Sequence, residues 1–380
     1  MDETYLLSPG PTPVPERARL RMARRLIHHR GPEFKKVFGR VRTGLEWLFE
    51  TEQDVLTLTC SGTGAFEAGI VNFTSTGDKV ISIGGGKFGE RWGDVAEANR
   101  REAVPLDVEW GSAVSLPQLE AALEEHPDVD MVTLTASETS TGVLHPVGEI
   151  AELIADRTDA LFAVDGITAV GVHRLPMDEL GVDVMVAGSQ KAFGIPPGLG
   201  FVAASERAWQ RYDDADSPGY YFDLGRERGR QVDDQTAFTP AIPQVLALDE
   251  VLQMMRDEGR RGIVDRHERN AHATRSAVVA MGLTVLGEPH SNAVTAVVTP
   301  DAISAPEVVS KMREDHGAVI AGGQKHLKPN VIRLGHIGFF QARDIIHMIS
   351  SLELTLADLG LPIEPGDGVE AVQSVFAKSG

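Results

Sequence analysis

The chain has 380 residues, 42% of them hydrophobic, which is enough for one large and one small domain. Its net charge of −19 argues against nucleic acids and anionic membrane surfaces as partners. No apolar run reaches the ~18 residues of a membrane span, and a single cysteine, Cys60, excludes a disulfide framework and a multi-cysteine metal site. The acidic N-terminus lacks the order of a signal peptide, so we expect a cytoplasmic protein.

The charged residues have an unusual make-up. Acidic residues are dispersed along the chain, and only 9 of the 36 basic residues are lysines. A dispersed acidic surface suits a protein dissolved in concentrated salt, where self-repulsion is screened. A halophilic source is therefore a hypothesis.

The N-terminal part alternates loop and helix. Residues 8–13 hold three prolines and read as a loop, and a helix is predicted from Pro15 to His28. Gly31 and Pro32 break it, and apolar residues near helical spacing predict a second helix from Glu33 to Phe49.

An α/β alternation follows. Strands are predicted at 55–59, 79–83, 103–108, 131–135, 161–165, 183–187 and from 200, with helices at 65–72, 90–100, 116–125 and 147–155. Alternating strands and helices with short glycine-bearing turns predict an open, mostly parallel sheet, which binds ligands at the carboxyl ends of its strands.

The C-terminal third has a looser pattern. Residues 213–240 read as an irregular polar excursion, and a long helix from Pro243 to Met281 is predicted to join two domains. Residues 282–365 alternate short strands and helices, as in a smaller α+β domain, and the tail after Pro365 carries little signal. We expect a division into residues 1–20, 21–255 and 256–380.

One strand end carries a candidate nucleophile. The apolar strand at 183–187 runs into Gly188-Ser-Gln-Lys191. A lysine where a buried strand ends can act as a nucleophilic amine, because apolar surroundings lower its pKa. Taken alone, a lysine in such a short motif is more often a surface lysine in a turn.

Three other strand ends carry polar groups. Residues 61–64 (Ser-Gly-Thr-Gly) are predicted to begin a helix, whose N-terminus is a candidate anion site. They lack the lysine of a P-loop. An ordinary serine N-cap would have the same sequence pattern. Asp165 ends the most apolar strand, where it either caps a turn or holds a cationic group. Residues 138–142 form a hydroxyl-rich turn.

A competing interpretation comes from residues 84–89. They formally fit the dinucleotide fingerprint, and Asp107 follows 18 residues later, close to the acid expected for NAD. An NAD-dependent oxidoreductase is the second hypothesis, but it leaves Lys191 and Asp165 without a role.

Together these groups match what pyridoxal phosphate needs: a lysine for its aldehyde, an acid for its pyridine nitrogen and a helix N-terminus for its phosphate. An aromatic side chain stacked on the cofactor ring completes the set. The sequence resembles the class V aminotransferases of the alanine–glyoxylate and serine–pyruvate type, over nearly the whole chain. The motifs that carry the resemblance are residues 61–63, 138–142, 164–165, and 188–191 with 196–198. It implies the fold-type I α/β architecture, with seven mostly parallel strands, helices on both faces and a smaller α+β C-terminal domain.

The resemblance assigns roles around the cofactor. Lys191 would bind the aldehyde, Asp165 would pair with the pyridine nitrogen, and Phe88 would stack on the ring where many relatives have tryptophan. Thr139 would hydrogen-bond the phenolic oxygen. The phosphate would be held by Ser61, Gly62, Thr63 and Gln190.

Further roles concern the subunit partner and the substrate. The family is dimeric, and Thr239 matches a position that completes the neighbouring subunit's phosphate site, whereas Thr236 stands where some relatives have tyrosine. Arg333 would clamp the substrate α-carboxylate through its fork. The N-terminal segment would lie over the active site, and Gly10 in it would leave room only for a short acceptor. Arg30 is either a second carboxylate site or a solvated helix-end arginine.

The sequence thus predicts a homodimeric aminotransferase that uses pyridoxal phosphate, with alanine or serine as donor, glyoxylate or pyruvate as acceptor, and no metal. The alternatives in the same class are an aspartate-type transaminase, a lyase, or a desulfurase, for which Cys60 is poorly placed. A non-catalytic regulator is a further alternative, against which the complete set of lysine, acid and arginine argues.

Overall fold

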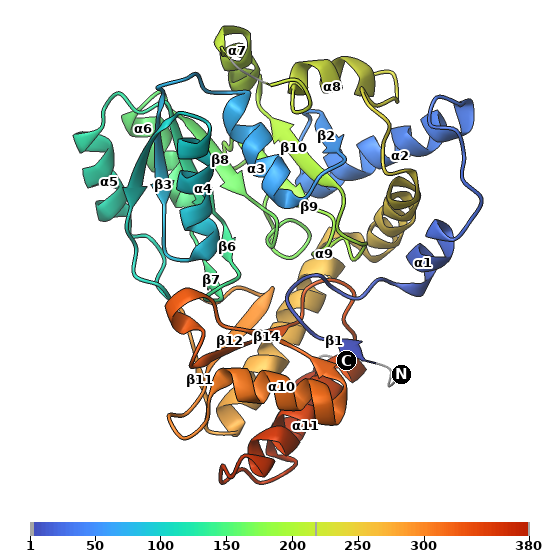
Figure 1. The fold of residues 1–380 in the computed structure, drawn as a ribbon, viewed down its shortest axis with the longest axis vertical. Coiled ribbons are helices and arrows are strands. Elements are labelled where there is room, and N and C mark those ends of the chain that lie inside the picture. Colours follow the sequence, from blue (N-terminus) through green and yellow to red (C-terminus); the bar gives the residue numbers. More distant parts are fainter. Residues whose placement is uncertain (1–3, 217–218, 379–380) are drawn as a thin grey trace.

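The computed structural model describes residues 4–216 and 219–378, and a seven-stranded sheet forms its centre (Figure 1). The strand order is β2-β10-β9-β8-β5-β3-β4, and only β10 runs antiparallel to its neighbours. The strands are β2 (Val55–Leu58), β3 (Lys79–Ile83), β4 (Glu102–Leu106), β5 (Met131–Thr135), β8 (Leu161–Asp165), β9 (Val184–Gly188) and β10 (Gly200–Ala204). The predicted mostly parallel sheet is confirmed.

Helices cover both faces of this sheet, so its inner strands are buried on both sides. Alternate strand residues join two separate apolar clusters. One cluster contains α2 (Pro32–Phe49), α5 (Leu116–Glu125), α6 (Val147–Arg157) and the first part of α9 (Ile242–Ala280). The other contains α3 (Gly62–Val71), α4 (Lys87–Ala98), α7 (Glu206–Asp214) and the start of α8 (Leu224–Gln231).

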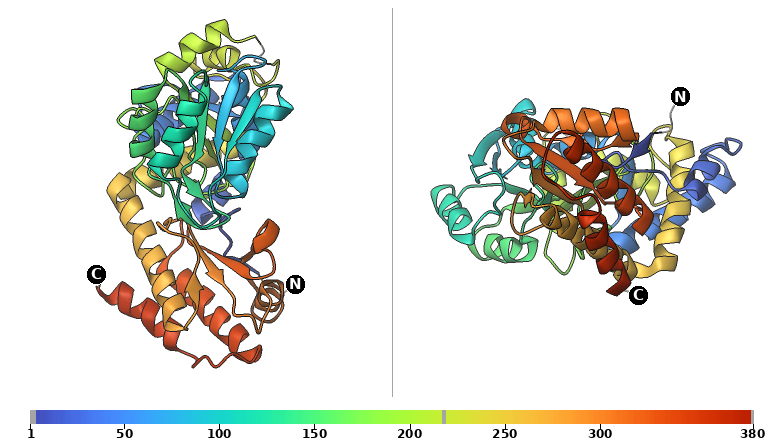
Figure 2. Two further views of the ribbon diagram at one scale, coloured as in Figure 1. Left: turned by 90° about the vertical axis from the view of Figure 1, so that its left-hand side faces the viewer. Right: turned by 90° about the horizontal axis from the view of Figure 1, so that it is seen from below.

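A second lobe follows the long helix α9, which runs between the two lobes (Figure 2). Its antiparallel sheet has the order β11-β12-β15-β14, formed by β11 (Thr284–Val285), β12 (Val294–Val298), β15 (Val331–Gly335) and β14 (Ala321–Gly322). An apolar cluster of its own lies under α10 (Ala305–His316), α11 (Ala342–Asp358) and α12 (Asp367–Lys378). The predicted boundaries at residues 20 and 255 stay a prediction.

The N-terminal segment crosses to this second lobe. β1 (Tyr5–Leu6) pairs in parallel with β13 (Ala318–Val319), and Leu7 packs in the second lobe's core. The chain then returns to α1 (Glu16–Met22) on the first lobe, so residues 8–13 pass between the two sheets (Figure 1). This path brings Gly10 to the carboxyl end of β9.

The long helix is confirmed, but it is not straight. Gly259 has φ 77° and ψ 152°, values that a helix interior does not contain, so the axis bends there. α1 ends at Met22, well before the predicted His28. Arg21 and Arg25 would be like charges one turn apart, and residues 23–26 are exposed, so no apolar contact would offset their repulsion.

One prediction of irregular structure is wrong, and the tail of low signal is helical. The stretch 213–240 contains α8, whose N-cap Asp223 accepts a hydrogen bond from the backbone N–H of Arg226 and whose two glycines hid its helical pattern. The tail contains α12, which packs on α9 and buries Val372. The remaining elements are the short pair β6 (Ser137–Glu138) and β7 (Val143–Leu144), and a 3₁₀ turn at Lys325–Leu327. In the part of the chain that the structure describes, no helix is long and apolar enough to cross a membrane.

Candidate active site

The predicted lysine and acid come together at the carboxyl ends of β8 and β9. Lys191 follows β9, and its amine donates a hydrogen bond to the carbonyl of Pro9, 2.8 Å away. Burial, and then the charge of Arg333, lower the pKa of Lys191 to about 8. A larger share of neutral amine is therefore present near neutral pH than for an exposed lysine.

Asp165 ends β8 and is only 3% exposed. One carboxylate oxygen accepts a hydrogen bond from the backbone N–H of Ile167 at 2.7 Å, and the other lies 3.4 Å from the hydroxyl of Thr135. Burial raises the pKa of Asp165 to about 7, and the charge of Glu138 acts in the same direction. A buried carboxyl of this kind is stabilised as the anion by a cation placed beside it.

Gly10 lies against the lysine. Its φ is +145°, and a Cβ there would be 2.3 Å from Nζ of Lys191. A side chain at this position would have to displace the amine.

The turn at the start of α3 fits a phosphate. Ser61 is the N-cap with extended backbone, its hydroxyl makes no capping bond, and both Ser61 and Thr63 are exposed. The N–H groups of Gly62 and Thr63 lie in the first helical turn, where no intrahelical carbonyl can accept from them. Nearby, Oε1 of Gln190 is buried without a partner among the described residues. Free donors at a helix N-terminus are the groups that a phosphate needs.

The side chain of Ile167 packs against this turn. A Cβ on Gly62 would lie 2.5 Å from Cδ1 of Ile167, so the glycine and the isoleucine share one small space. Ile167 was not singled out from the sequence, although it follows the predicted acid by two residues.

Phe88 lies in the first turn of α4, with the guanidinium carbon of Arg91 4.7 Å from its ring centre. Arg91 also lies 3.3 Å from the hydroxyl of Thr63, and it forms no ion pair among the described residues. Sequence reasoning missed this arginine, because nothing in the pattern showed that α4 turns it toward the start of α3.

The glycines around Phe88 have packing roles. A Cβ on Gly86 would lie 2.2 Å from the side chain of Glu138, and one on Gly89 would lie 2.6 Å from the carbonyl of Ile83. The fingerprint at 84–89 is therefore explained by close packing of α4 on β3 and on the 138–142 turn.

Thr139 and Arg333 meet across the two lobes. Arg333 lies on β15, is 7% exposed, and donates from Nε to the carbonyl of Gly322 at 2.8 Å and from Nη1 to the carbonyl of Thr139 at 3.0 Å. These bonds use two of its five N–H donors. The hydroxyl of Thr139 donates to that of Thr168 at 3.1 Å, so its own oxygen can still accept a bond.

The partner-directed residues lie elsewhere. Thr239 is exposed on the rim of a small pocket that Tyr221 and Phe238 also line, and the hydroxyl of Thr236 is turned inward to the carbonyl of Phe238. Arg30 donates to the side chain of Gln235 and to the carbonyls of Thr236 and Ala237. Arg30 therefore holds this loop, which leaves the suggested second carboxylate site without support.

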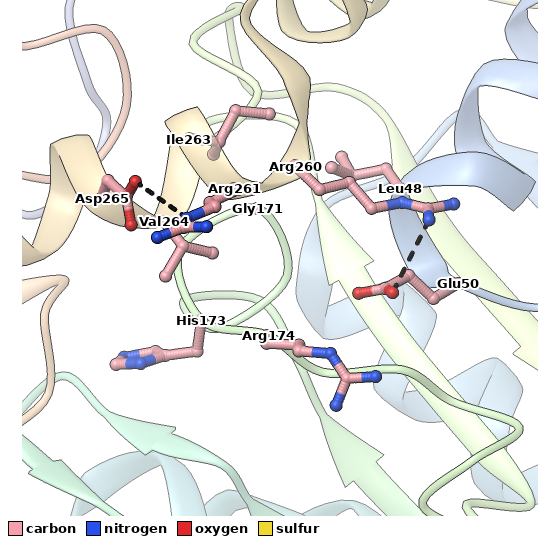
Figure 3. Close-up of a pocket in the computed structure, with 10 residues that line it drawn as sticks. All are labelled: Leu48, Glu50, Gly171, His173, Arg174, Arg260, Arg261, Ile263, Val264 and Asp265. Carbon is pink, nitrogen blue, oxygen red and sulfur yellow. Dashed lines mark ion pairs between the residues drawn. The ribbon is translucent and has the colours of Figure 1, made fainter.

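A separate cavity of about 330 Å³ lies beside the bend of α9 (Figure 3). His173 and Arg174 line one side of it. All three of its arginines are paired: Arg174 with Glu179, Arg260 with Glu50 at 3.7 Å and Arg261 with Asp265 at 3.6 Å, the last two drawn in Figure 3. None of the predicted site residues lines this cavity, so it is distinct from the site around Lys191.

Comparison with known proteins places this chain in a family. Residues 4–342 match the model of the class V aminotransferases. The chain is 42% identical over 381 residues to the soluble hydrogenase 42 kDa subunit of Anabaena cylindrica, covering 99% of both chains. It is 32% identical over 378 residues to the L-aspartate–glyoxylate aminotransferase of Paracoccus denitrificans, covering 98% and 96%. The solved structure of an alanine–glyoxylate aminotransferase from Nostoc superposes with a TM-score of 0.89 at 28% identity, covering 94% and 96%. The chain belongs to the class V aminotransferases, enzymes of fold type I that depend on pyridoxal phosphate.

Proposed function

We propose that this enzyme transfers the amino group of a small amino acid, alanine or serine, to a short 2-oxo acid, glyoxylate or pyruvate. The observation that carries the proposal is the contact of Gly10 with Lys191, because it brings backbone up to the reacting amine. We infer from this close approach that the site takes a short substrate. Pyridoxal phosphate, when bound, supplies an electron sink for the electrons released at the substrate's Cα.

Lys191 would hold the cofactor through its amine and then move the proton at the substrate's Cα. Its lowered pKa favours both roles, because a protonated amine can neither attack an aldehyde nor accept a proton. Asp165 would accept a hydrogen bond from the protonated pyridine nitrogen, and its burial excludes the water that would compete for that bond.

The substrate would be oriented by Arg333. With two donors engaged by the carbonyls of Gly322 and Thr139, its side chain is fixed before any carboxylate arrives. Three donors remain for a bidentate pair with the α-carboxylate. A preorganised fork costs little conformational entropy on binding.

We further propose a homodimer in which Thr239 completes the phosphate site of the neighbouring subunit. Tyr220 is 73% exposed, and its ring lies beside that of Phe238, which stacks on Tyr221. An exposed aromatic patch next to Thr239 fits a subunit contact. Mixing inactive Lys191→Ala and Thr239→Ala subunits tests this arrangement, because mixed dimers would regain one intact site.

An aspartate-type transaminase is the second candidate. The relative from Paracoccus is named for aspartate as donor. Arg91, near Phe88 and Thr63, offers a guanidinium that has no carboxylate partner among the residues the structure describes. A matrix of alanine, serine and aspartate against glyoxylate, pyruvate and 2-oxoglutarate decides between the candidates. The proposal fails if aspartate or 2-oxoglutarate gives the highest kcat/KM.

The other hypotheses have less support. Burial raises the pKa of Cys60 to about 12, so it is a poor nucleophile for a desulfurase. The glycine pattern that suggested a nicotinamide cofactor is explained by close packing around Gly86 and Gly89. The hydrogenase name belongs to the relative from Anabaena, and one cysteine cannot supply a multi-cysteine cluster. We keep a cytoplasmic location and a halophilic source as proposals, the latter testable by running the matrix with and without molar salt.

A further inference from the structure

We propose that Glu138 is a positioning residue that sets the aromatic ring of Phe88 against the cofactor and ties it to the substrate clamp. The inference rests on the proposed function only in treating Phe88 as the ring that stacks on pyridoxal phosphate. The role assigned to Glu138 comes from its contacts in this chain.

The start of α4 is capped from a distant segment. Its N-cap, Gly86, has no side chain to cap with, so the first N–H groups of the helix need other acceptors. The backbone N–H groups of Phe88 and Gly89 both donate to Oε2 of Glu138, each at 2.9 Å. The N–H of Lys87 donates to the hydroxyl of Ser140 at 3.1 Å. The helical turn that carries Phe88 is thus held from the 138–142 turn.

The second carboxylate oxygen of Glu138 is also engaged. Oε1 accepts hydrogen bonds from the backbone N–H of Ser140 at 2.9 Å and from its hydroxyl at 2.6 Å. Four donors on two oxygens suit an ionised carboxylate, which can only accept. The side chain is 1% exposed, and an anion at the N-terminus of α4 also interacts favourably with the helix dipole.

The packing leaves this carboxylate little freedom. Because a Cβ on Gly86 would overlap the Glu138 side chain at 2.2 Å, the helix start lies directly on the carboxylate. A shift of Glu138 would therefore shift the backbone of Phe88.

The same turn reaches the clamp and the reacting groups. Thr139, the next residue, accepts through its carbonyl from Arg333 and donates through its hydroxyl to Thr168. The charge of Glu138 raises the pKa of both Lys191 and Asp165. One buried residue thus sets the positions of the ring and the clamp, and influences the charge state of the reacting pair.

The chain offers a matched control in Glu353. This residue is 3% exposed, and both of its carboxylate oxygens accept hydrogen bonds at the start of α12: Oε1 from the N–H groups of Gly368 at 2.5 Å and Val369 at 3.2 Å, and Oε2 from the N–H of Gly366 at 3.3 Å. It is a buried carboxylate that caps a helix of the second lobe, and no predicted site residue contacts it. Glu353→Gln therefore reports the stability cost of losing such a cap without a change at the cofactor site.

The experiment compares Glu138→Gln with Glu353→Gln in the holoenzyme. We expect both variants to lower Tm, because both carboxylate oxygens accept hydrogen bonds in each residue and the amide NH₂ that replaces one of them cannot accept. Only Glu138→Gln should raise the Kd for pyridoxal phosphate at least 10-fold, reduce the induced circular dichroism of the cofactor's visible band, and move the spectrophotometric titration of that band to lower pH. If Glu138→Gln matches wild type in Kd, dichroism and titration while losing the same Tm as Glu353→Gln, the inference is overturned.

Two further arms keep the outcome clear. If Glu138→Gln does not fold, Ser140→Ala is measured in its place, because it removes one donor to the carboxylate and the acceptor of the Lys87 N–H. It should change Kd and dichroism in the same direction by a smaller factor. Unchanged values for a folded Ser140→Ala contradict the inference. The readouts need bound cofactor but no turnover. A wild-type protein that binds cofactor and transaminates no donor would refute the proposed function and leave the Glu138 result standing.

Discussion

The substitution Arg333→Lys tests the substrate clamp. In the native chain Nε and Nη1 of Arg333 hold the carbonyls of Gly322 and Thr139, while the remaining N–H donors are available for a carboxylate. A lysine keeps the charge, but its single ammonium cannot hold both carbonyls and form a fork. The α-carboxylate therefore loses one charge-assisted hydrogen bond, and the other loses its fixed direction.

The size of the effect follows from these contacts. A hydrogen bond to a charged group contributes about 1.5–3 kcal/mol, and the site is 7% exposed at Arg333, so water replaces little of it. We expect a loss of about 2–4 kcal/mol, which is roughly 30- to 1000-fold in kcat/KM for every α-carboxylate substrate. The loss should appear mainly in KM and should be the same for donor and acceptor.

The assay is steady-state kinetics with alanine and glyoxylate, each varied separately, together with the visible spectrum of the bound cofactor. Arg101→Lys is the matched control, because Arg101 is 5% exposed and also holds backbone carbonyls, those of Thr74 and Asn99, away from the site. It should lower stability without changing KM. Unchanged KM values for both substrates in Arg333→Lys would move the clamp to another residue.

Three further predictions concern single residues. Asp165→Asn should still bind cofactor, with binding weaker by about 1–3 kcal/mol because a neutral hydrogen bond replaces an ionic one. It should lose at least about 100-fold in kcat. Near-full activity would show that the acid lies elsewhere. Gly10→Ala should reduce activity by about 10-fold or more, because the backbone at φ +145° disfavours a side chain and the new Cβ would meet Lys191, and unchanged kinetics would contradict the close approach. Burial lowers the pKa of His145 from 6.5 to about 4. The contribution of the neutral imidazole to the free energy of unfolding is therefore fully present above pH 6.5 and is lost as the pH falls toward 4, about 3 kcal/mol in all. Denaturant titrations from pH 7.5 to 4.5 should show a flatter pH dependence for His145→Gln, and equal slopes would refute this.

The large lobe was predictable because its inner strands are continuous apolar runs with charged or glycine-bearing ends. The strand Leu161–Asp165 is an example, since burial on both faces leaves no ambiguity of pattern. The helices α8 and α12 were missed for the opposite reason. Each carries glycines or charges in its first turns, and each is stabilised by contacts with distant elements, as in the cap that Glu353 provides for α12.

The site was predictable where a residue type at a strand end has chemical meaning by itself, as for Lys191 and Asp165. It was not predictable where a role depends on distant contacts. Glu138 and Phe88 are 50 residues apart in sequence, and only the packing of α4 shows that one holds the other. Arg30 illustrates the reverse, because its charge suggested a substrate contact and the fold uses it to hold the loop at 235–237.

The central claim is that Lys191 carries pyridoxal phosphate. Wild-type protein reconstituted with pyridoxal phosphate should be yellow, and reduction with borohydride followed by peptide mass spectrometry should place one pyridoxyl group on Lys191. Lys191→Ala should fold, show no such visible band and take up no label at that peptide. A colourless wild type after reconstitution, or a label on any of the other eight lysines in place of Lys191, would contradict the account.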